Sequence, residues 1–280
     1  MRVIYYYQSF VGLQQLINTP QYTTHLNLGA IHFGSDDNNN SYIHLNNDSP
    51  YDDMYNDLWK EIKQVQDLNI KVNLMIGGAG GGFEYFFNNY EVCYELLTNL
   101  IINSNINGVD LDIEEYVDIN NVIKLINQLR LDFDDDFIIT MAPISSSLQY
   151  DQPGLGGFVY KQLYDIVGDK INWFNVQEYN DYTYESYELM INNYYPANKL
   201  VFGMLSSEYN VNLFNDALNE IKKIYDKWND FGGCFTFEYF NAPPNVNNPI
   251  VWSQKIYNTI NDLWICKLFN SFYESLFGKL

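Results

Sequence analysis

Cysteine is scarce in this chain of 280 residues, and its three cysteines do not form a pattern. Cys93, Cys234 and Cys266 are odd in number, and no pair has the spacing of metal ligands. The sequence therefore predicts neither a disulfide framework nor a zinc site. No metal and no cofactor is expected.

Basic residues are also few, with 15 lysines and arginines against 35 acidic residues. The resulting net charge of −20 would repel phosphate groups, which argues against a nucleic acid partner. It suits an uncharged partner such as a neutral polysaccharide. The same charge can also serve solubility alone.

Long apolar runs are missing, and no stretch reaches the roughly 18 residues that a membrane span needs. The N-terminus has no basic segment followed by an apolar one, so no signal peptide is expected. Met1 and Arg2 lead at once into an apolar run that ends at Tyr7. We expect an intracellular protein, or one whose removed leader preceded Met1. The location therefore stays open.

What the chain does have is an alternation of short apolar runs with longer amphipathic stretches, which is typical of βα units and a parallel sheet. Strands are predicted at residues 2–7, 25–33, 71–76, 107–114, 137–142, 172–178, 200–205 and 233–238. Helices are predicted at residues 51–68, 84–102, 117–131, 157–167, 184–193, 211–228 and 249–263. A closed barrel of eight such units needs about 250 residues. The sequence predicts an α/β fold, a single (β/α)8 TIM barrel. An open doubly wound sheet is the alternative, but no strand is followed by a dinucleotide fingerprint.

We expect the barrel to occupy residues 1–264 and to act as a monomer. The polar stretch 36–52 is predicted to be a loop over the barrel mouth. Residues 265–280 place apolar side chains on one helical face and are predicted to be an amphipathic helix that packs on the barrel. Contact with a membrane or a partner is the alternative for this tail.

The predicted strand at 107–114 carries three carboxylates, Asp110, Asp112 and Glu114, at a spacing of two. In a strand this spacing puts the three side chains on one face. The intervening residues are branched aliphatics, as in a strand covered by helices. Charges are costly to bury, so the row needs a reason. An edge strand with a wet face is one explanation. The other is a catalytic row that ends at the barrel mouth, where active sites of this fold lie.

This stretch also resembles a known motif. The run Asn107-Gly108-Val109-Asp110-Leu111-Asp112-Ile113-Glu114 is similar to the Asp-Gly-x-Asp-x-Asp-x-Glu pattern of glycoside hydrolase family 18, with Asn in place of the first Asp. The resemblance covers nearly the whole chain and implies a chitinase-like glycosidase. By this resemblance the protein would cut β-1,4 bonds of N-acetylglucosamine polymers, with Glu114 as the general acid.

The resemblance also explains the row of acids. An ordinary glycosidase needs a second carboxylate across the sugar ring. In family 18 the N-acetyl group of the substrate attacks instead, which is substrate-assisted retaining catalysis. Asp112 would then orient the acetamide N–H and balance the positive oxazolinium ion. Asp110 would hold Asp112 by sharing a proton.

Further site residues follow from the same resemblance. Tyr179 matches a tyrosine whose hydroxyl binds the acetamide carbonyl, although a core aromatic is the alternative. Gln177 and Asn180 are its neighbouring polar contacts. Met141 could line the floor under the acetamide or be an ordinary core residue. Glu178 faces away by strand alternation and is left out.

Two more parts of the predicted site, the glycine pair Gly77–Gly78 and Phe237, depart from the family pattern or allow two explanations. Gly77 and Gly78 resemble the family's second signature, with Met75 where a serine is usual. These two glycines allow the backbone either to approach a ligand closely or to form a tight turn. Phe237 stands where the family usually has the tryptophan under the distorted sugar, and it offers a smaller platform.

Three functions remain open on the sequence. The first is hydrolysis of chitin or chitooligosaccharides, and the second is an endo-β-N-acetylglucosaminidase acting on N-glycans. The third is a catalytically weak chitin-binding lectin on the same barrel. Glu114, Asp112 and Tyr179 favour an enzyme. The three histidines, His25, His32 and His44, receive no role.

Overall fold

The structure is a computed structural model that describes residues 1–179 and 181–261. The predictions for Asn180, for Cys266 and for the tail at 265–280 lie outside the described residues. The other sequence predictions can be compared with the fold.

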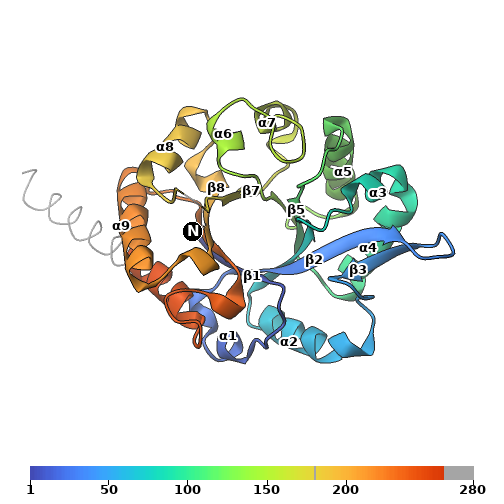
Figure 1. The fold of residues 1–280 in the computed structure, drawn as a ribbon, viewed down its shortest axis with the longest axis horizontal. Coiled ribbons are helices and arrows are strands. Elements are labelled where there is room, and N and C mark those ends of the chain that lie inside the picture. The colour runs from blue at the N-terminus through green and yellow to red at the C-terminus, as the bar shows by residue number, and fades with distance from the viewer. Residues whose placement is uncertain (180, 262–280) are drawn as a thin grey trace, which may run out of the picture.

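Eight parallel strands close into a barrel, as the sequence predicts. They are β1 (Arg2–Tyr7), β2 (His25–Ser35), β4 (Lys71–Gly77), β5 (Gly108–Asp112), β6 (Ile138–Met141), β7 (Trp173–Gln177), β8 (Leu200–Leu205) and β9 (Gly233–Phe237). Each pairs with the next along the chain, and β1 pairs with both β9 and β2, which closes the ring. Figure 1 shows this ring of strands inside a ring of helices. The (β/α)8 TIM barrel is confirmed, and the open sheet is excluded.

Helices surround the strands, and three of the described ones begin at a side-chain cap. The helices are α1 (Gln14–Asn18), α2 (Asn56–Asp67), α3 (Phe83–Asn88), α4 (Tyr90–Asn103), α5 (Ile119–Asp132), α6 (Ser146–Gln149), α7 (Tyr160–Val167), α8 (Tyr184–Asn192), α9 (Val211–Lys227) and a helix over 250–261. Short 3-10 turns are η1 (Pro20–Tyr22), η2 (Asp53–Tyr55), η3 (Ala197–Lys199), η4 (Ser206–Glu208) and η5 (Tyr239–Asn241). The Asp118 and Asn210 side chains accept from the first backbone N–H groups of α5 and α9.

Some helix boundaries differ from the prediction. The helix predicted at 84–102 is two helices, α3 and α4, which meet at Asn89. The short helices α1 and α6 were not predicted, because four or five residues are too few to show a helical period.

The predicted mouth loop at 36–52 is wrong. It contains a ninth strand, β3 (Ser41–Leu45), which pairs antiparallel with the extended end of β2. The turn between them is held by Asp36 Oδ1, which accepts from the backbone of Asn38 and Asn40 at 2.8 Å each. Figure 1 shows this hairpin pointing outward from the ring, away from its centre.

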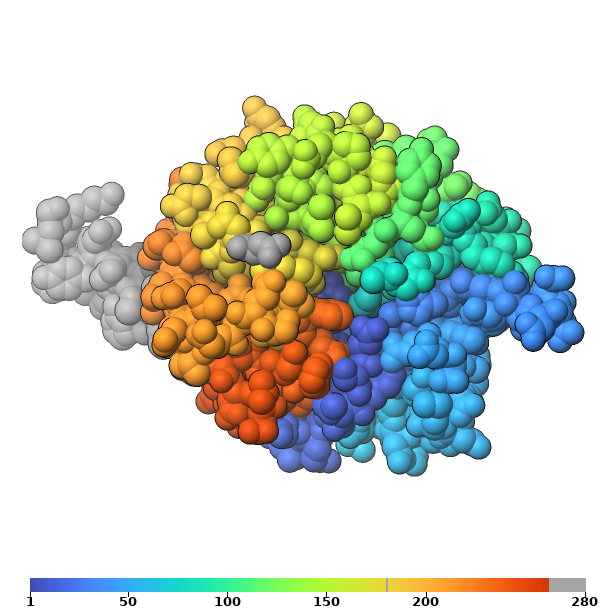
Figure 2. Space-filling view, in the orientation of Figure 1, coloured from blue at the N-terminus to red at the C-terminus, as the bar shows by residue number. Residues whose placement is uncertain are grey.

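The core has two parts. The outer part packs apolar side chains between the strands and the helices. The inner part, enclosed by the strands, contains a smaller apolar cluster and a layer of buried polar side chains. That polar layer is formed by Asn27, Asn73, Asp110, Thr140 and Asn175, all fully buried. Side chains thus fill the centre that looks open between the ribbons, as the space-filling view in Figure 2 shows.

Within residues 1–179 and 181–261, no helix has both the length and the apolar character that a membrane crossing requires. Cys93 and Cys234 are buried and free.

Candidate active site

The three acids of the motif lie where β5 meets the barrel mouth. β5 runs between β4 and β6, and each of its residues is buried, so it is not a wet edge strand. Asp110 and Asp112 belong to the strand, and Glu114 follows two residues beyond its end. The period of two therefore raises the acids stepwise from the barrel interior to the mouth.

Asp110 is bound on both carboxylate oxygens. Its Oδ2 accepts from Tyr6 Oη at 2.5 Å and from Asn27 Nδ2 at 3.4 Å. Its Oδ1 accepts from Thr140 Oγ1 at 2.6 Å and from Asn175 Nδ2 at 2.9 Å. Burial raises the pKa of Asp110, and the bonds from Thr140, Tyr6 and Asn175 act against that rise. Donors from four other strands thus fix this carboxyl in the barrel centre.

Asp112 lies above Asp110 and is nearly buried. Its Oδ1 accepts from Gln177 Nε2 at 3.0 Å. Burial raises the pKa of Asp112 well above its ordinary value, and the neighbouring charges of Glu114 and Asp110 raise it further. The Gln177 bond acts in the opposite direction. These surroundings therefore favour the protonated form of Asp112 more than those of an exposed aspartate would.

Gln177 joins the two upper acids. Besides Asp112, its Nε2 lies 3.4 Å from Glu114 Oε1 and 2.8 Å from the Ala142 carbonyl oxygen. One amide nitrogen thus reaches two carboxylates and the end of β6. This fixes the position of Asp112 relative to Glu114.

A pocket of about 230 Å³ opens beside these side chains. Asp112, Glu114 and Gln177 form one part of its wall, and Tyr179 and Phe237 form another. The structure therefore brings these five predicted residues together around one cavity. Asp110 lies beneath it, behind Asp112.

The two aromatic residues pack against the inner core. Tyr179 makes an edge contact with Phe235 at 6.5 Å between ring centroids, and Phe237 lies 5.8 Å from Tyr6. Burial raises the pKa of Tyr179 well above its ordinary value, and the charges of Asp112 and Glu114 add to the shift. The Tyr179 hydroxyl therefore stays protonated and able to donate at any ordinary pH.

Gly77 and Gly78 line the same pocket, and their backbone decides between the two explanations for them. Both have positive φ, at 93° and 78°. A Cβ on Gly77 would lie 2.4 Å from the carbonyl oxygen of Asp112, and that oxygen accepts from Gly78 N at 2.8 Å. The glycines are required for a tight turn against β5, and this turn forms part of the pocket wall.

Met141 is not part of the pocket. It is fully buried in the core that faces the helices, because Thr140, its neighbour on β6, faces the barrel interior. The pocket is lined instead by Ala142, the next residue along, and by Met75 from β4. The prediction of Met141 as the floor under the substrate is therefore wrong, and its core alternative is correct.

Several pocket residues were missed by the sequence analysis. They are Tyr6, Gln8, Ala30, His32, Met75 and Leu205. His32 was given no role, yet it lines the wall, with Nδ1 2.9 Å from the Gly81 carbonyl oxygen. Its place on the inner face of β2 becomes visible only with the barrel closed.

Glu178 lies on the far side of β7, as strand alternation predicts. It is buried, and its Oε2 accepts from Ser186 Oγ at 2.6 Å. Burial raises the pKa of Glu178 to about 7. This carboxyl binds the first turn of α8 and does not line the pocket.

No group of three or more His, Cys, Asp or Glu side chains in the described part of the chain is arranged to hold a metal ion.

The family model of glycosyl hydrolases family 18 matches residues 2–256. The chain belongs to glycosyl hydrolase family 18. The match spans the whole barrel and includes every predicted site residue. A search of curated proteins finds no match. The family assignment makes this protein a glycosidase with a carbohydrate substrate.

Solved structures agree with this assignment. A fungal endo-β-N-acetylglucosaminidase of family 18 is 27% identical, with a TM-score of 0.82, and the match covers 92% of this chain and 98% of that one. The chitinase ChiC from Aspergillus fumigatus is 30% identical, with a TM-score of 0.80 and coverages of 87% and 93%. The xylanase-A-amylase inhibitor protein XAIP-III, 18% identical over 92% of this chain and 98% of its own, shares the fold at a TM-score of 0.63.

Proposed function

We propose that this family 18 enzyme hydrolyses β-1,4 bonds in chitin and chitooligosaccharides by substrate-assisted retaining catalysis. One observation carries the proposal. Among the described residues that line the pocket, Asp112 and Glu114 are the only carboxylates, and both come from the end of β5. A two-carboxylate mechanism needs acids on opposite sides of the sugar ring. The substrate must then supply the nucleophile itself.

In the first step Glu114 would donate its proton to the glycosidic oxygen. The carbonyl oxygen of the substrate's acetamide attacks the anomeric carbon, the bond to the leaving saccharide breaks, and an oxazolinium ion forms. Its positive charge favours the ionised form of Asp112, because an opposite charge lowers the pKa of a carboxyl group, and a proton carried by Asp112 would pass to the neighbouring Asp110 carboxylate. Asp112 can then accept the acetamide N–H, while the Tyr179 hydroxyl donates to the acetamide carbonyl.

In the second step Glu114 would remove a proton from water, and the water oxygen attacks the anomeric carbon. The oxazolinium ring opens, and the product keeps the β configuration after two inversions. Gln177 holds the two acids at a fixed separation through both steps, because its amide contacts both. Asp110 and its four donors supply the rigid base under Asp112.

The second candidate is an endo-β-N-acetylglucosaminidase that cuts the chitobiose core of N-glycans. It is favoured by the likeness to a fungal enzyme of that name over 92% of this chain. The same acids would serve, since the bond cut again lies next to an N-acetylglucosamine residue. A lectin is disfavoured because Glu114, Asp112 and Tyr179 are all present around the pocket.

The experiment is to offer fluorogenic chitooligosaccharides and an N-glycosylated protein side by side to the wild-type chain, with Glu114→Gln as control. The proposal predicts release of fluorophore by the wild type and none above background by the variant. Release of N-glycans without turnover of chitooligosaccharides would select the second candidate. Turnover of neither would contradict both.

A further inference from the structure

A second concave surface lies on the flank of the barrel, along α2 and the turn that joins α4 to β5. Its volume is about 480 Å³, larger than that of the catalytic pocket. We call it the α2 groove. It extends from Pro50 and Tyr51, before α2, to the segment just before β5, so it runs from one end of the barrel toward the other.

The groove contains two aromatic rings near one end. Trp59 packs partly against the core, and its Nε1 donates to the Pro50 carbonyl oxygen at 2.7 Å. This bond and the packing hold the indole in one orientation. Tyr51 is 55% exposed beside it. A fixed ring that is partly open to solvent binds a flat apolar face with little loss of side-chain entropy.

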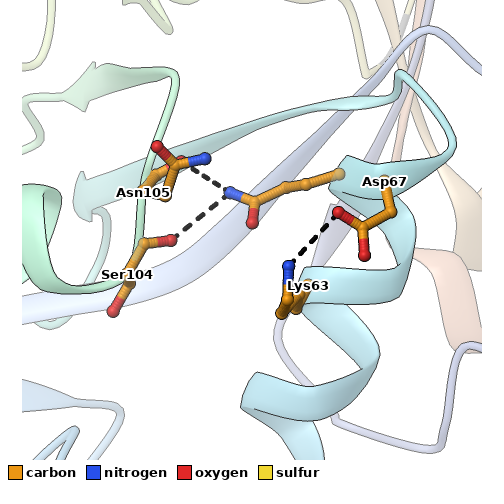
Figure 3. A network of polar contacts seen from close by, with 5 residues as sticks. Lys63, Asp67, Ser104 and Asn105 are labelled. Atoms are coloured by element: carbon orange, nitrogen blue, oxygen red, sulfur yellow. Dashed lines mark hydrogen bonds and ion pairs between the residues drawn. The ribbon is translucent and has the colours of Figure 1, made fainter.

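Polar groups line the other end. Gln66 Nε2 donates to the Asn105 carbonyl oxygen at 2.7 Å and reaches that of Ser104 at 3.4 Å, so α2 is tied to the turn before β5 (Figure 3). One turn earlier, Lys63 Nζ lies 3.3 Å from Asp67 Oδ1 (Figure 3). These two side chains are 74% and 64% exposed, so the pair contributes little to stability and its donors and acceptors remain open to a ligand.

This combination excludes several ligand classes. The Lys63 ammonium is balanced by Asp67, so the groove has no excess of positive charge for phosphate groups. Amide side chains from Asn56, Gln66 and Asn103 interrupt the apolar surface that a hydrophobic helix would need. Fixed rings beside neutral amides match a sugar chain, whose rings have apolar faces and hydroxyl edges.

We propose that the α2 groove is a second carbohydrate site, which holds a chain of β-1,4-linked N-acetylglucosamine away from the catalytic pocket. The choice of this sugar rests on the proposed function, and the side-chain amides of the groove complement its acetamide groups. A polymer bound there is kept near the enzyme while the pocket cuts another part of it. Short substrates that fill only the pocket do not use the groove.

The test uses the catalytically silent Glu114→Gln protein labelled with 5-fluorotryptophan and titrated with chitohexaose. The fluorine resonance of Trp59 is assigned by its loss in Trp59→Phe, a change that keeps an aromatic ring in the core. We expect this resonance to shift in a saturable manner. The double variant Lys63→Ala/Asp67→Ala should weaken that binding about fivefold, in the range for a few lost contacts to a ligand.

The matched control is Lys161→Ala/Asp165→Ala, which removes a pair of the same spacing from α7. It should leave the Trp59 titration unchanged. Turnover of a short fluorogenic substrate by the Lys63→Ala/Asp67→Ala protein, with Glu114 restored, should also be unchanged.

The proposal would be overturned if the Trp59 resonance did not shift at chitohexaose concentrations that saturate the pocket. An equal shift with cellohexaose would overturn the choice of sugar and with it the proposal as stated. Failure of the proposed function is seen separately, because a wild-type protein that cuts no chitooligosaccharide can still show the Trp59 shift. If the wild-type protein cuts chitooligosaccharides while the Trp59 resonance does not shift, the proposed function holds and the second carbohydrate site is excluded.

Discussion

At the scale of single residues, the site depends on unequal treatment of three similar acids. Asp110 receives four hydrogen bonds and Asp112 receives one. Glu114 lies at the mouth and lines the pocket. Under the proposed function, the three carboxyl groups act as a rigid base, a charge partner and a proton donor, according to their depth in the barrel.

Glu114→Gln should reduce turnover by about 10²–10⁴-fold, because the amide cannot donate a proton to the leaving group. The fold should persist, since the substitution is isosteric and Gln can still accept the bond from Gln177. Steady-state kinetics and thermal unfolding of both proteins check this. More than a tenth of wild-type activity in the variant would show that Glu114 is not the acid.

Phe237→Trp should lower KM or raise the rate for chitooligosaccharides. The resemblance to the family places Phe237 under the distorted sugar, and an indole covers more of a pyranose face than a phenyl ring does. The extra volume must fit beside Tyr6, and overpacking costs about 1–3 kcal/mol. Unfolding by urea is therefore measured with the kinetics. A well-folded variant with unchanged kinetics and affinity would remove Phe237 from the sugar platform.

At the scale of elements, β7 shows how one strand serves two purposes. Its inward face carries Asn175 and Gln177, which bind Asp110 and Asp112. The next residue, Glu178, points outward into a buried network with Ser186 and Gln149. The end of this strand therefore links Asp110 and Asp112 to the first turn of α8.

Glu178 should make stability depend on pH. Its pKa is raised from 4.5 to about 7 in the folded protein, so the folded state binds more protons than the unfolded state between these values. Stability is then greatest below about pH 4.5 and falls as pH rises toward 7, by roughly 2–3 kcal/mol for this group. Glu178→Gln should remove this contribution while keeping the bond from Ser186.

The contribution of Glu178 to stability is measured by urea unfolding of the wild type and of Glu178→Gln at several pH values between 4.5 and 7.5. The difference in unfolding free energy between the two proteins should change steadily in favour of the variant as pH rises. A constant difference across this range would mean that Glu178 does not titrate there.

The strands could be predicted from the sequence because each buried run is apolar on both faces or alternates with polar residues. The motif on β5 placed Asp110, Asp112 and Glu114 correctly relative to one another. Met141 could not be assigned to the pocket floor or to the core from the sequence, because β6 has only four residues and its register is set by the pairing of Thr140 with its neighbours. His32 and Tyr6 were missed because their contacts come from distant parts of the chain.

The hairpin β2–β3 was missed for a different reason. Its tip is rich in Asn and Asp, which indicate a loop, and β3 has only five residues. The pairing of His32 with His44 extends the sheet beyond the barrel. No local pattern predicts such an extension, because its stability comes from the longer partner strand.

At the scale of the whole molecule, a strongly acidic protein surrounds a pocket for which we propose an acetamide-dependent reaction. The net charge of −20 should attract chitosan, the deacetylated and cationic form of the polymer. Binding and cleavage of the polymer should therefore differ, because chitosan without acetyl groups should bind to the protein but should not be cut. Sedimentation with the polymer and a reducing-end assay measure the two, and efficient cleavage would contradict substrate assistance.

The central claim is that the substrate's own acetamide attacks the anomeric carbon, because the described residues of the pocket offer carboxylates from one side only. Attack by this group followed by attack of water inverts the anomeric carbon twice. Proton NMR of a chitooligosaccharide digest in its first minutes, before mutarotation, measures the outcome directly. The account predicts that the β anomer of the new reducing end appears first, and initial appearance of the α anomer would contradict it.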